Sequence, residues 1–249
     1  MSKRLLMLYP HGIGDCILLT PVLRKLHADK KFDSIAIGLD EDRAYDSGVL
    51  ANCPYVDEVY PIPCPHGYST YYEGEVKMLN KAQLIMEEGR YNMISNIVHQ
   101  GRDNKISINF AAFQYEQVMK EDLRTEVFLS EEDRAFAKEF VGDRRFTFIH
   151  GSSPSLPPKD FPTDFLEEIR KDGNVIEVGV DFQPTEFDIN KQFAIMELAD
   201  KIYVIDSAFY HAAHALGKKV DLAYFNRGEG VYNRVRPLHN VEETIEFEL

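Results

Sequence analysis

The chain has 249 residues, enough for one large domain or two small ones. Hydrophobic residues make up 44% of it, an ordinary share for a globular protein, which excludes the disordered and fibrous classes. The formal net charge of −13 repels a polyanion, so the composition carries no general signature of nucleic-acid binding.

The cysteines and the N-terminal stretch indicate the compartment. An odd number of cysteines, with no second pair to complete a zinc site, is typical of reduced thiols in a cytosolic protein. The apolar stretch Leu5–Tyr9 is too short for a signal peptide and ends at Pro10. No apolar run approaches the roughly 20 residues of a membrane span. We therefore expect a soluble, cytoplasmic protein, for which a peripheral contact with a membrane surface stays open.

The first half of the chain alternates short apolar runs with helical patterns. The expected strands are Leu5–Tyr9, Ser34–Leu39 and Tyr91–Val98, with Leu123–Leu129 as an extended edge segment. The expected helices are Cys16–Ala28, Glu75–Glu88 and Glu131–Val141. Ser130 precedes the last of these helices and acids fill its first turn, which is the pattern of a capped helix start. The stretch Pro61–Tyr72 is expected to be a loop, and the alternation predicts a parallel sheet covered by helices.

The pattern restarts after Gly142, which predicts one Rossmann-like domain over residues 1–142 and a second, smaller one over residues 145–249. The expected strands of the second domain are Arg145–Ile149, Val175–Val178, Lys201–Ile205 and Val220–Phe225. Its expected helices are Pro162–Lys171, Phe193–Ala199 and a helix that follows Asp206 and ends near Leu216. The stretch His150–Pro158 is expected to be a loop.

Two strand-to-helix junctions carry the main functional signals. The first is Gly12-Ile13-Gly14-Asp15 and the second begins at Asp206-Ser207. A helix start leaves unpaired N–H groups and a partial positive charge, so we expect a ligand held between the two domains. The third glycine of a dinucleotide-binding fingerprint is missing because position 17 is Ile, so the motif is weak evidence for a nicotinamide or flavin cofactor. Asp15 also stands where a helix cap belongs, so capping alone is the alternative to a chemical role.

Together the two strings resemble the lipopolysaccharide heptosyltransferases, glycosyltransferase family 9, which belong to the GT-B class. After the first junction the resemblance continues through Thr20-Pro21. At the second junction the matching residues are Asp206, Ser207, His211, Ala212, Ala215, Leu216 and Gly217. The chain departs from the family at Ala208, where glycine is usual, and at His214, where a small residue is usual.

The resemblance implies an α/β, GT-B fold with two Rossmann-like domains facing across a cleft, the C-terminal one reduced. It makes Asp15 the catalytic base. The donor-binding residues that it implies are Gly14, Ser152, Lys159, Asp206, Ser207, Ala208 and His211. For Lys159 the alternative is a solvated lysine in a proline-rich loop, and for His211 a structural histidine. The acid that holds the donor ribose stays open between Glu177, Asp181 and Glu186.

The reaction implied by the resemblance is inverting transfer of a sugar from a nucleotide-diphosphate donor, such as ADP-heptose, to a glycan or other acceptor hydroxyl. No metal and no separate cofactor are implied, since the donor is a substrate. Asp40-Glu41-Asp42 has the spacing of the metal motif of GT-A enzymes, but we interpret it as a solvated helix cap. Three alternatives stay open: transfer to a hydroxymethylated DNA base, a non-catalytic nucleotide-sugar-binding module, and a nicotinamide-dependent oxidoreductase.

Overall fold

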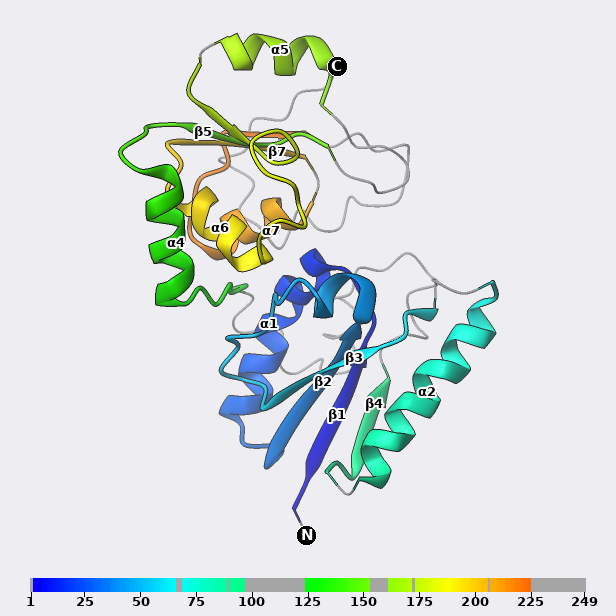
Figure 1. Ribbon diagram of the computed structural model, residues 1–249. Coiled ribbons are helices and arrows are strands. Elements are labelled where there is room, and N and C mark those ends of the chain that lie inside the picture. The colour runs from blue at the N-terminus through cyan, green and yellow to red at the C-terminus, as the bar shows by residue number, and fades with distance from the viewer. Residues whose placement is uncertain are drawn as a thin grey trace. The chain divides into compact units, whose positions relative to one another are not determined.

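The computed structural model describes residues 2–65, 69–88, 90–96, 124–152, 161–171, 173–205 and 207–224. The chain divides into two compact units, Met1–Phe128 and Leu129–Leu249 (Figure 1). Each unit contains its own parallel sheet with helices, which confirms the α/β class.

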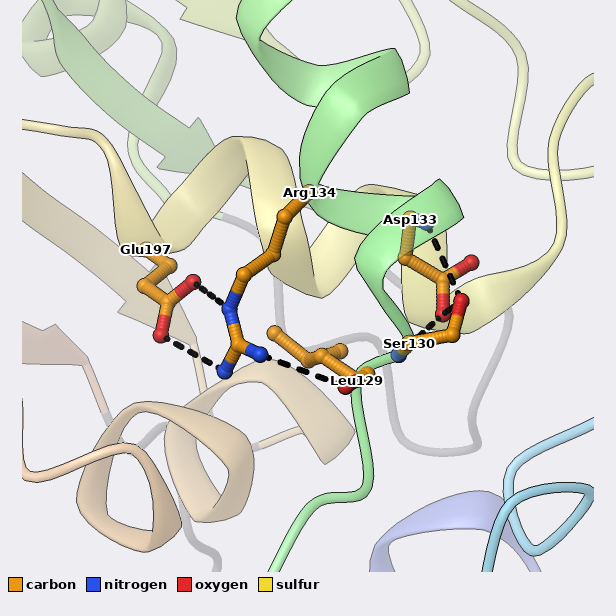
Figure 2. A network of polar contacts seen from close by, with 5 residues as sticks. All are labelled: Leu129, Ser130, Asp133, Arg134 and Glu197. Atoms are coloured by element: carbon orange, nitrogen blue, oxygen red, sulfur yellow. Dashed lines mark hydrogen bonds and ion pairs between the residues drawn. The ribbon is translucent and has the colours of Figure 1, made fainter.

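The division between the units lies before helix α4 (Glu131–Val141), whereas the sequence suggested a boundary after residue 142. The physical reason is that α4 packs on α6 (Ile189–Glu197) of the second unit. Arg134 of α4 donates to both carboxylate oxygens of Glu197, at 3.1 and 3.4 Å (Figure 2). The units therefore span residues 1–128 and 129–249 rather than 1–142 and 145–249.

The first unit has, in its described part, a parallel sheet in the strand order β3-β2-β1-β4. Its strands are β1 (Arg4–Tyr9), β2 (Ser34–Asp40), β3 (Glu58–Ile62) and β4 (Met93–Asn96). The central strands β1 and β2 are buried almost throughout, which is why they read as continuous apolar runs. Helices α1 (Ile13–Ala28) and α2 (Tyr71–Glu87) cover this sheet (Figure 1). Met78 and Ala82 of α2 pack in one core cluster with Leu6 and Leu8 of β1.

The expected loop Pro61–Tyr72 is wrong at both ends, because it begins inside β3 and ends inside α2. Proline lacks the N–H that a strand ladder uses, but β3 is the terminal strand of the described sheet, where proline is tolerated. Thr70 caps α2 by accepting a hydrogen bond from the Glu73 N–H at 3.1 Å. This cap places the helix start ahead of the expected Glu75.

The expected edge segment Leu123–Leu129 forms no strand over its described part, residues 124–129. It is bonded to α1 instead. The Glu126 N–H donates to Thr20 Oγ1 at 2.8 Å, and Arg24 Nη1 bonds Glu126 Oε2 at 2.5 Å. Helix α1 therefore supplies the partners that a neighbouring strand would have supplied.

The second unit has, over its described residues, a parallel sheet in the order β6-β5-β7-β8. Its strands are β5 (Thr147–His150), β6 (Val175–Glu177), β7 (Lys201–Ile205) and β8 (Leu222–Tyr224). Besides α4 and α6, its helices are α5 (Thr163–Lys171) and α7 (Ala208–Ala215). Phe209 of α7 packs on Phe148 and Phe193, with ring centroids 5.4 and 5.3 Å apart, which joins α7 to β5 and α6 in one aromatic core.

Two further expectations concern the whole chain. None of the three cysteines, Cys16, Cys53 and Cys64, all of which the structure describes, forms a disulfide, and the expectation of reduced thiols is consistent with this. Among the residues that the structure describes, no helix combines the length and the apolar character that crossing a membrane requires.

Candidate functional site

Each sheet has a topological switch point, where the chain continues to one side of the sheet from one strand and to the other side from its neighbour. In the first unit β1 has β2 on one side and β4 on the other, and in the second unit β5 lies between β6 and β7. In open parallel α/β sheets, ligands bind outside the carboxyl ends of the strands at such a point. The segment Gly12–Asp15 follows β1, and Ser207 follows β7 beside β5. Both junctions identified in the sequence therefore lie at switch points.

The first junction is a tight turn from β1 into α1, with Gly12 as the N-cap residue. The Gly12 N–H donates to Asp15 Oδ2 at 3.2 Å, and the Tyr9 hydroxyl donates to the Asp15 backbone carbonyl at 3.2 Å. Gly12 has no side chain to cap the helix, so the half-buried Asp15 carboxylate fills this part of a capping box. Asp15 is thus not the N-cap residue that the sequence predicted, because α1 begins at Ile13, but its carboxylate does bond the N–H of the N-cap residue Gly12; its role as catalytic base stays a prediction.

The second junction holds an unusual serine. Ser207 is the N-cap residue of α7, yet its side chain makes no capping hydrogen bond. Its Oγ lies 3.0 Å from Nδ1 of His150, the last residue of β5. The hydroxyl of a capping serine normally accepts a hydrogen bond from an N–H of the first helical turn. Because Ser207 makes no such bond, its side chain does not cap the start of α7.

His150 was expected to begin a loop and was not predicted as a site residue, but the structure makes it the last residue of β5. Its ring lies against Phe209 with centroids 4.5 Å apart and an interplanar angle of 32°. Burial lowers the pKa of this half-buried imidazole from 6.5 to about 4, so the ring is neutral at pH 7. A polar residue directly after the buried Phe148-Ile149 strand was the signal that could have identified it.

The residue that follows β5 is bonded to the segment that precedes α5. The Phe161 N–H donates to the Gly151 carbonyl at 2.8 Å, so the chain before α5 meets the end of β5. Ser152 follows Gly151 and is exposed. Lys159, predicted as a donor-binding residue in this loop, lies outside the described residues, as does Asp206.

The other predicted donor residues occupy different positions. Ala208 is the first residue of α7, whereas Gly14 lies in the first turn of α1 in the other unit. His211 is buried at 7% exposure, and its ring contacts that of Tyr210 with centroids 5.6 Å apart. This burial is compatible with a structural histidine, so the ligand-facing role of His211 stays a prediction.

The three candidate ribose acids differ in their partners. Glu177, the last residue of β6, is buried and accepts two hydrogen bonds from Arg170 of α5, both at 2.8 Å. Asp181 is exposed and accepts a hydrogen bond from the Glu177 N–H at 2.7 Å. Glu186 is exposed and accepts from the Gln183 N–H at 3.1 Å. The Glu177 carboxylate is therefore already paired with a cation, whereas Asp181 and Glu186 bond only main-chain N–H groups in these contacts.

The acidic triplet at the end of β2 caps the turn that follows it. Asp40 Oδ1 accepts a hydrogen bond from the Asp42 N–H at 3.0 Å, which confirms the cap. The expectation that this cap is solvated is wrong for Asp40, which is only 2% exposed. The burial arises because Asp40 ends β2, a central strand of the sheet. Within the described ranges, no group of three or more His, Cys, Asp or Glu residues could hold a metal ion.

Comparisons with known proteins identify the fold. No protein-family model matches the sequence, and no curated protein matches it significantly. The glycosyl transferase family 9 structure from Veillonella parvula DSM 2008 matches with a TM-score of 0.66 and 17% identity, covering 99% of this chain and 87% of that chain. E. coli ADP-heptose lps heptosyltransferase II matches with a TM-score of 0.64 and 15% identity, covering 99% of this chain and 91% of that chain. E. coli heptosyltransferase WaaC with ADP-2-deoxy-2-fluoro heptose matches with a TM-score of 0.56 and 10% identity, covering 99% of this chain and 93% of that chain.

At these identities the likeness establishes the fold. It confirms the expected structural resemblance to glycosyltransferase family 9 and to the heptosyltransferases. The chain has the α/β fold of the GT-B glycosyltransferases, with one parallel sheet in each of its two units.

Proposed function

We propose that this protein is an inverting glycosyltransferase that moves a sugar from a nucleotide-diphosphate donor to an acceptor hydroxyl. The observation that carries the proposal is that both junctions of the heptosyltransferase-like pattern lie at the switch points of their sheets. The structural neighbours support the same class, since they include an ADP-heptose heptosyltransferase and a heptosyltransferase with an ADP-sugar analogue.

We assign the donor diphosphate to the second unit. Ser207 and the first turn of α7 offer a hydroxyl and main-chain N–H groups beside the end of β5. Ser152 follows that strand, and Lys159 adds the positive charge that a departing diphosphate needs. An ADP-sugar is the donor class that the neighbours favour.

We assign the general base to Asp15. Its carboxylate takes the proton of the acceptor hydroxyl while that oxygen bonds the anomeric carbon and the bond from this carbon to the diphosphate breaks. The nucleotide diphosphate leaves with the electron pair of the broken bond. Capping does not conflict with this role, because a carboxylate has about four acceptor sites and the Gly12 N–H uses one of them.

A thermal-shift screen tests the donor site first. The purified protein is heated with ADP, UDP, GDP, CMP, dTDP or NAD, and a ligand of the folded state raises the melting temperature. We expect one diphosphate nucleotide to raise Tm by a few degrees, and Lys159→Ala or His211→Ala to abolish the shift. Lys171→Ala, which removes an exposed lysine of α5, is the matched control and should keep it. A shift with NAD alone would favour an oxidoreductase, and no shift with any nucleotide would contradict the donor site.

The hydrogen bond that Asp15 accepts from the Gly12 N–H favours one second candidate, a nucleotide-sugar-binding module without catalysis. Asp15→Asn separates the two functions, because the amide oxygen still accepts from the Gly12 N–H but cannot take a proton at neutral pH. If the protein is an enzyme with Asp15 as its base, sugar transfer by Asp15→Asn should fall at least about 100-fold while nucleotide binding persists. Asp42→Asn, an exposed acid in the same unit, is the control and should leave transfer unchanged. Unchanged transfer in Asp15→Asn would rule out Asp15 as the base.

A further inference from the structure

The contact between Ser207 and His150 has two alternative proton arrangements. A serine hydroxyl has one proton and two acceptor lone pairs, and a neutral imidazole has one N–H and one bare nitrogen. With Nδ1 bare, the Ser207 proton is used in the 3.0 Å contact to His150. With the proton on Nδ1, His150 donates to Oγ and the Ser207 proton is available to another group.

The residues around His150 fix the position of its imidazole ring, so the two arrangements differ in the location of one proton and not in the position of the ring. His150 ends a strand that pairs with both β6 and β7, and its ring lies on Phe209, which is buried at 4% exposure. The ring is neutral at pH 7, since burial lowers its pKa to about 4. A neutral ring offers one donor only, so the location of that proton decides what Ser207 presents to its surroundings.

An anionic ligand distinguishes the two arrangements. A phosphate oxygen accepts hydrogen bonds and is repelled by hydroxyl lone pairs, so it needs the Ser207 proton. We propose that His150 is a positioning residue for the donor site, which carries its proton on Nδ1 when a nucleoside diphosphate is bound and thereby makes Ser207 a donor to a phosphate oxygen. The inference rests on the proposed donor site in the second unit, and it adds His150, which neither the pattern nor the family resemblance assigned.

Nucleotide titrations of variants test whether His150 acts through Ser207. The probe is ADP, or the diphosphate nucleotide that the thermal-shift screen selects. Ser207→Ala should weaken its Kd about tenfold, the loss expected for one hydrogen bond to a charged group, and His150→Phe, which keeps the hydroxyl but removes the group that orients it, should weaken it by up to the same factor. His150→Asn places an amide N–H near Nδ1 and should restore Kd to within about threefold, whereas His150→Gln, which reaches toward Nε2, should not.

A double variant separates positioning from a general packing role. If His150 acts only through Ser207, Ser207→Ala with His150→Phe binds as weakly as Ser207→Ala alone. Losses that multiply in the double variant, up to about 100-fold together, would contradict the inference. His27→Phe, at an exposed histidine of α1 in the first unit, is the matched control and should bind like the unmodified chain.

The tautomer is read directly from the unmodified protein, and only the assignment of the signals needs a folded variant. Nitrogen-15 NMR of histidine-labelled protein distinguishes a ring N–H from a bare ring nitrogen, and the His150 signals are those missing from His150→Phe. We expect Nδ1–H in the nucleotide complex. Nε2–H in that complex, or equal Kd values for all variants, would overturn the inference and leave the donor site intact. If no nucleotide binds the unmodified protein, the proposed function fails first.

Discussion

Burial sets the charge state of His150 and thereby couples this residue to stability. In the unfolded chain its pKa is that of an ordinary histidine, 6.5, whereas in the folded protein burial lowers it to about 4. At a pH between these two pKa values, His150 binds a proton in the unfolded state but not in the folded state. The folded state is therefore fully stabilised with respect to this group above pH 6.5 and loses stability as the pH falls towards 4.

We predict that acidification destabilises the protein through His150. The cost between about pH 7 and pH 4 is at most about 3 kcal/mol, because one pKa unit corresponds to 1.36 kcal/mol and the ring is partly exposed. The measurement is urea unfolding at several pH values in the unmodified protein and in His150→Phe. The difference in stability between the two should change through this window, with the unmodified protein losing more. Parallel pH profiles would show that His150 is not a buried neutral histidine.

Helix α1 contains a proline and compensates for it locally. Pro21 has no N–H, so the carbonyl of Ile17 loses its usual helical partner. The Thr20 hydroxyl donates to this Ile17 carbonyl at 2.7 Å and accepts from the Glu126 N–H at 2.8 Å. Thr20 is completely buried, so both bonds are made away from water. The Thr20-Pro21 pair of the resemblance therefore has a structural role, in which it joins the segment around Glu126 to α1.

We predict that Thr20→Val destabilises the first unit by about 2–3 kcal/mol, because valine leaves the Ile17 carbonyl and the Glu126 N–H buried without their partner. Thr20→Ser keeps the hydroxyl and should cost clearly less. In a Pro21→Ala background the new Ala N–H can bond the Ile17 carbonyl, so Thr20→Val should cost about 1 kcal/mol less. The measurement is denaturant unfolding of the four combinations, and strictly additive free energies would contradict this account of the proline.

The covalent connection between the two units is bonded on both sides. Asn52 of the first unit donates to the Phe128 carbonyl at 3.2 Å, and Arg134 of the second unit donates to the Leu129 carbonyl at 3.3 Å. Arg134 is held by Glu197, and Ser130 forms a capping box with Asp133 (Figure 2). The described start of the second unit is thus anchored within its first few residues.

We predict that Arg134→Ala exposes the connection to chymotrypsin, which cleaves after aromatic residues such as Phe128. The ion pair is partly exposed, with side-chain exposures of 39% and 27%, so global stability should change by less than about 1 kcal/mol. Loss of the bond to Leu129 should raise the rate of cleavage after Phe128 about fivefold, because local opening becomes easier. Arg144→Ala, which removes an arginine that bonds the last carbonyls of α4, is the matched control. Equal cleavage rates in Arg134→Ala and the unmodified chain would contradict the anchoring role.

The sequence by itself determined what depends on neighbours along the chain. The alternation of apolar runs and helical patterns predicted the parallel α/β class, and a serine before acids predicted the capped start of α4, which Ser130 and Asp133 confirm. The two junctions were found because glycine, aspartate and serine mark helix starts within a few residues.

Only the tertiary structure decided which distant segments become neighbours. Strand order, and with it the switch points, arises from pairing between segments that no local period encodes. The same holds for His150 and Ser207, which are 57 residues apart in the chain and 3.0 Å apart in the fold. Pro61 lies in a strand against its propensity because β3 is paired with β2, and α4 belongs to the second unit because it packs on α6. Apart from proline in a helix, local preferences are worth about 1 kcal/mol or less per residue, so packing and pairing can override them where the two disagree.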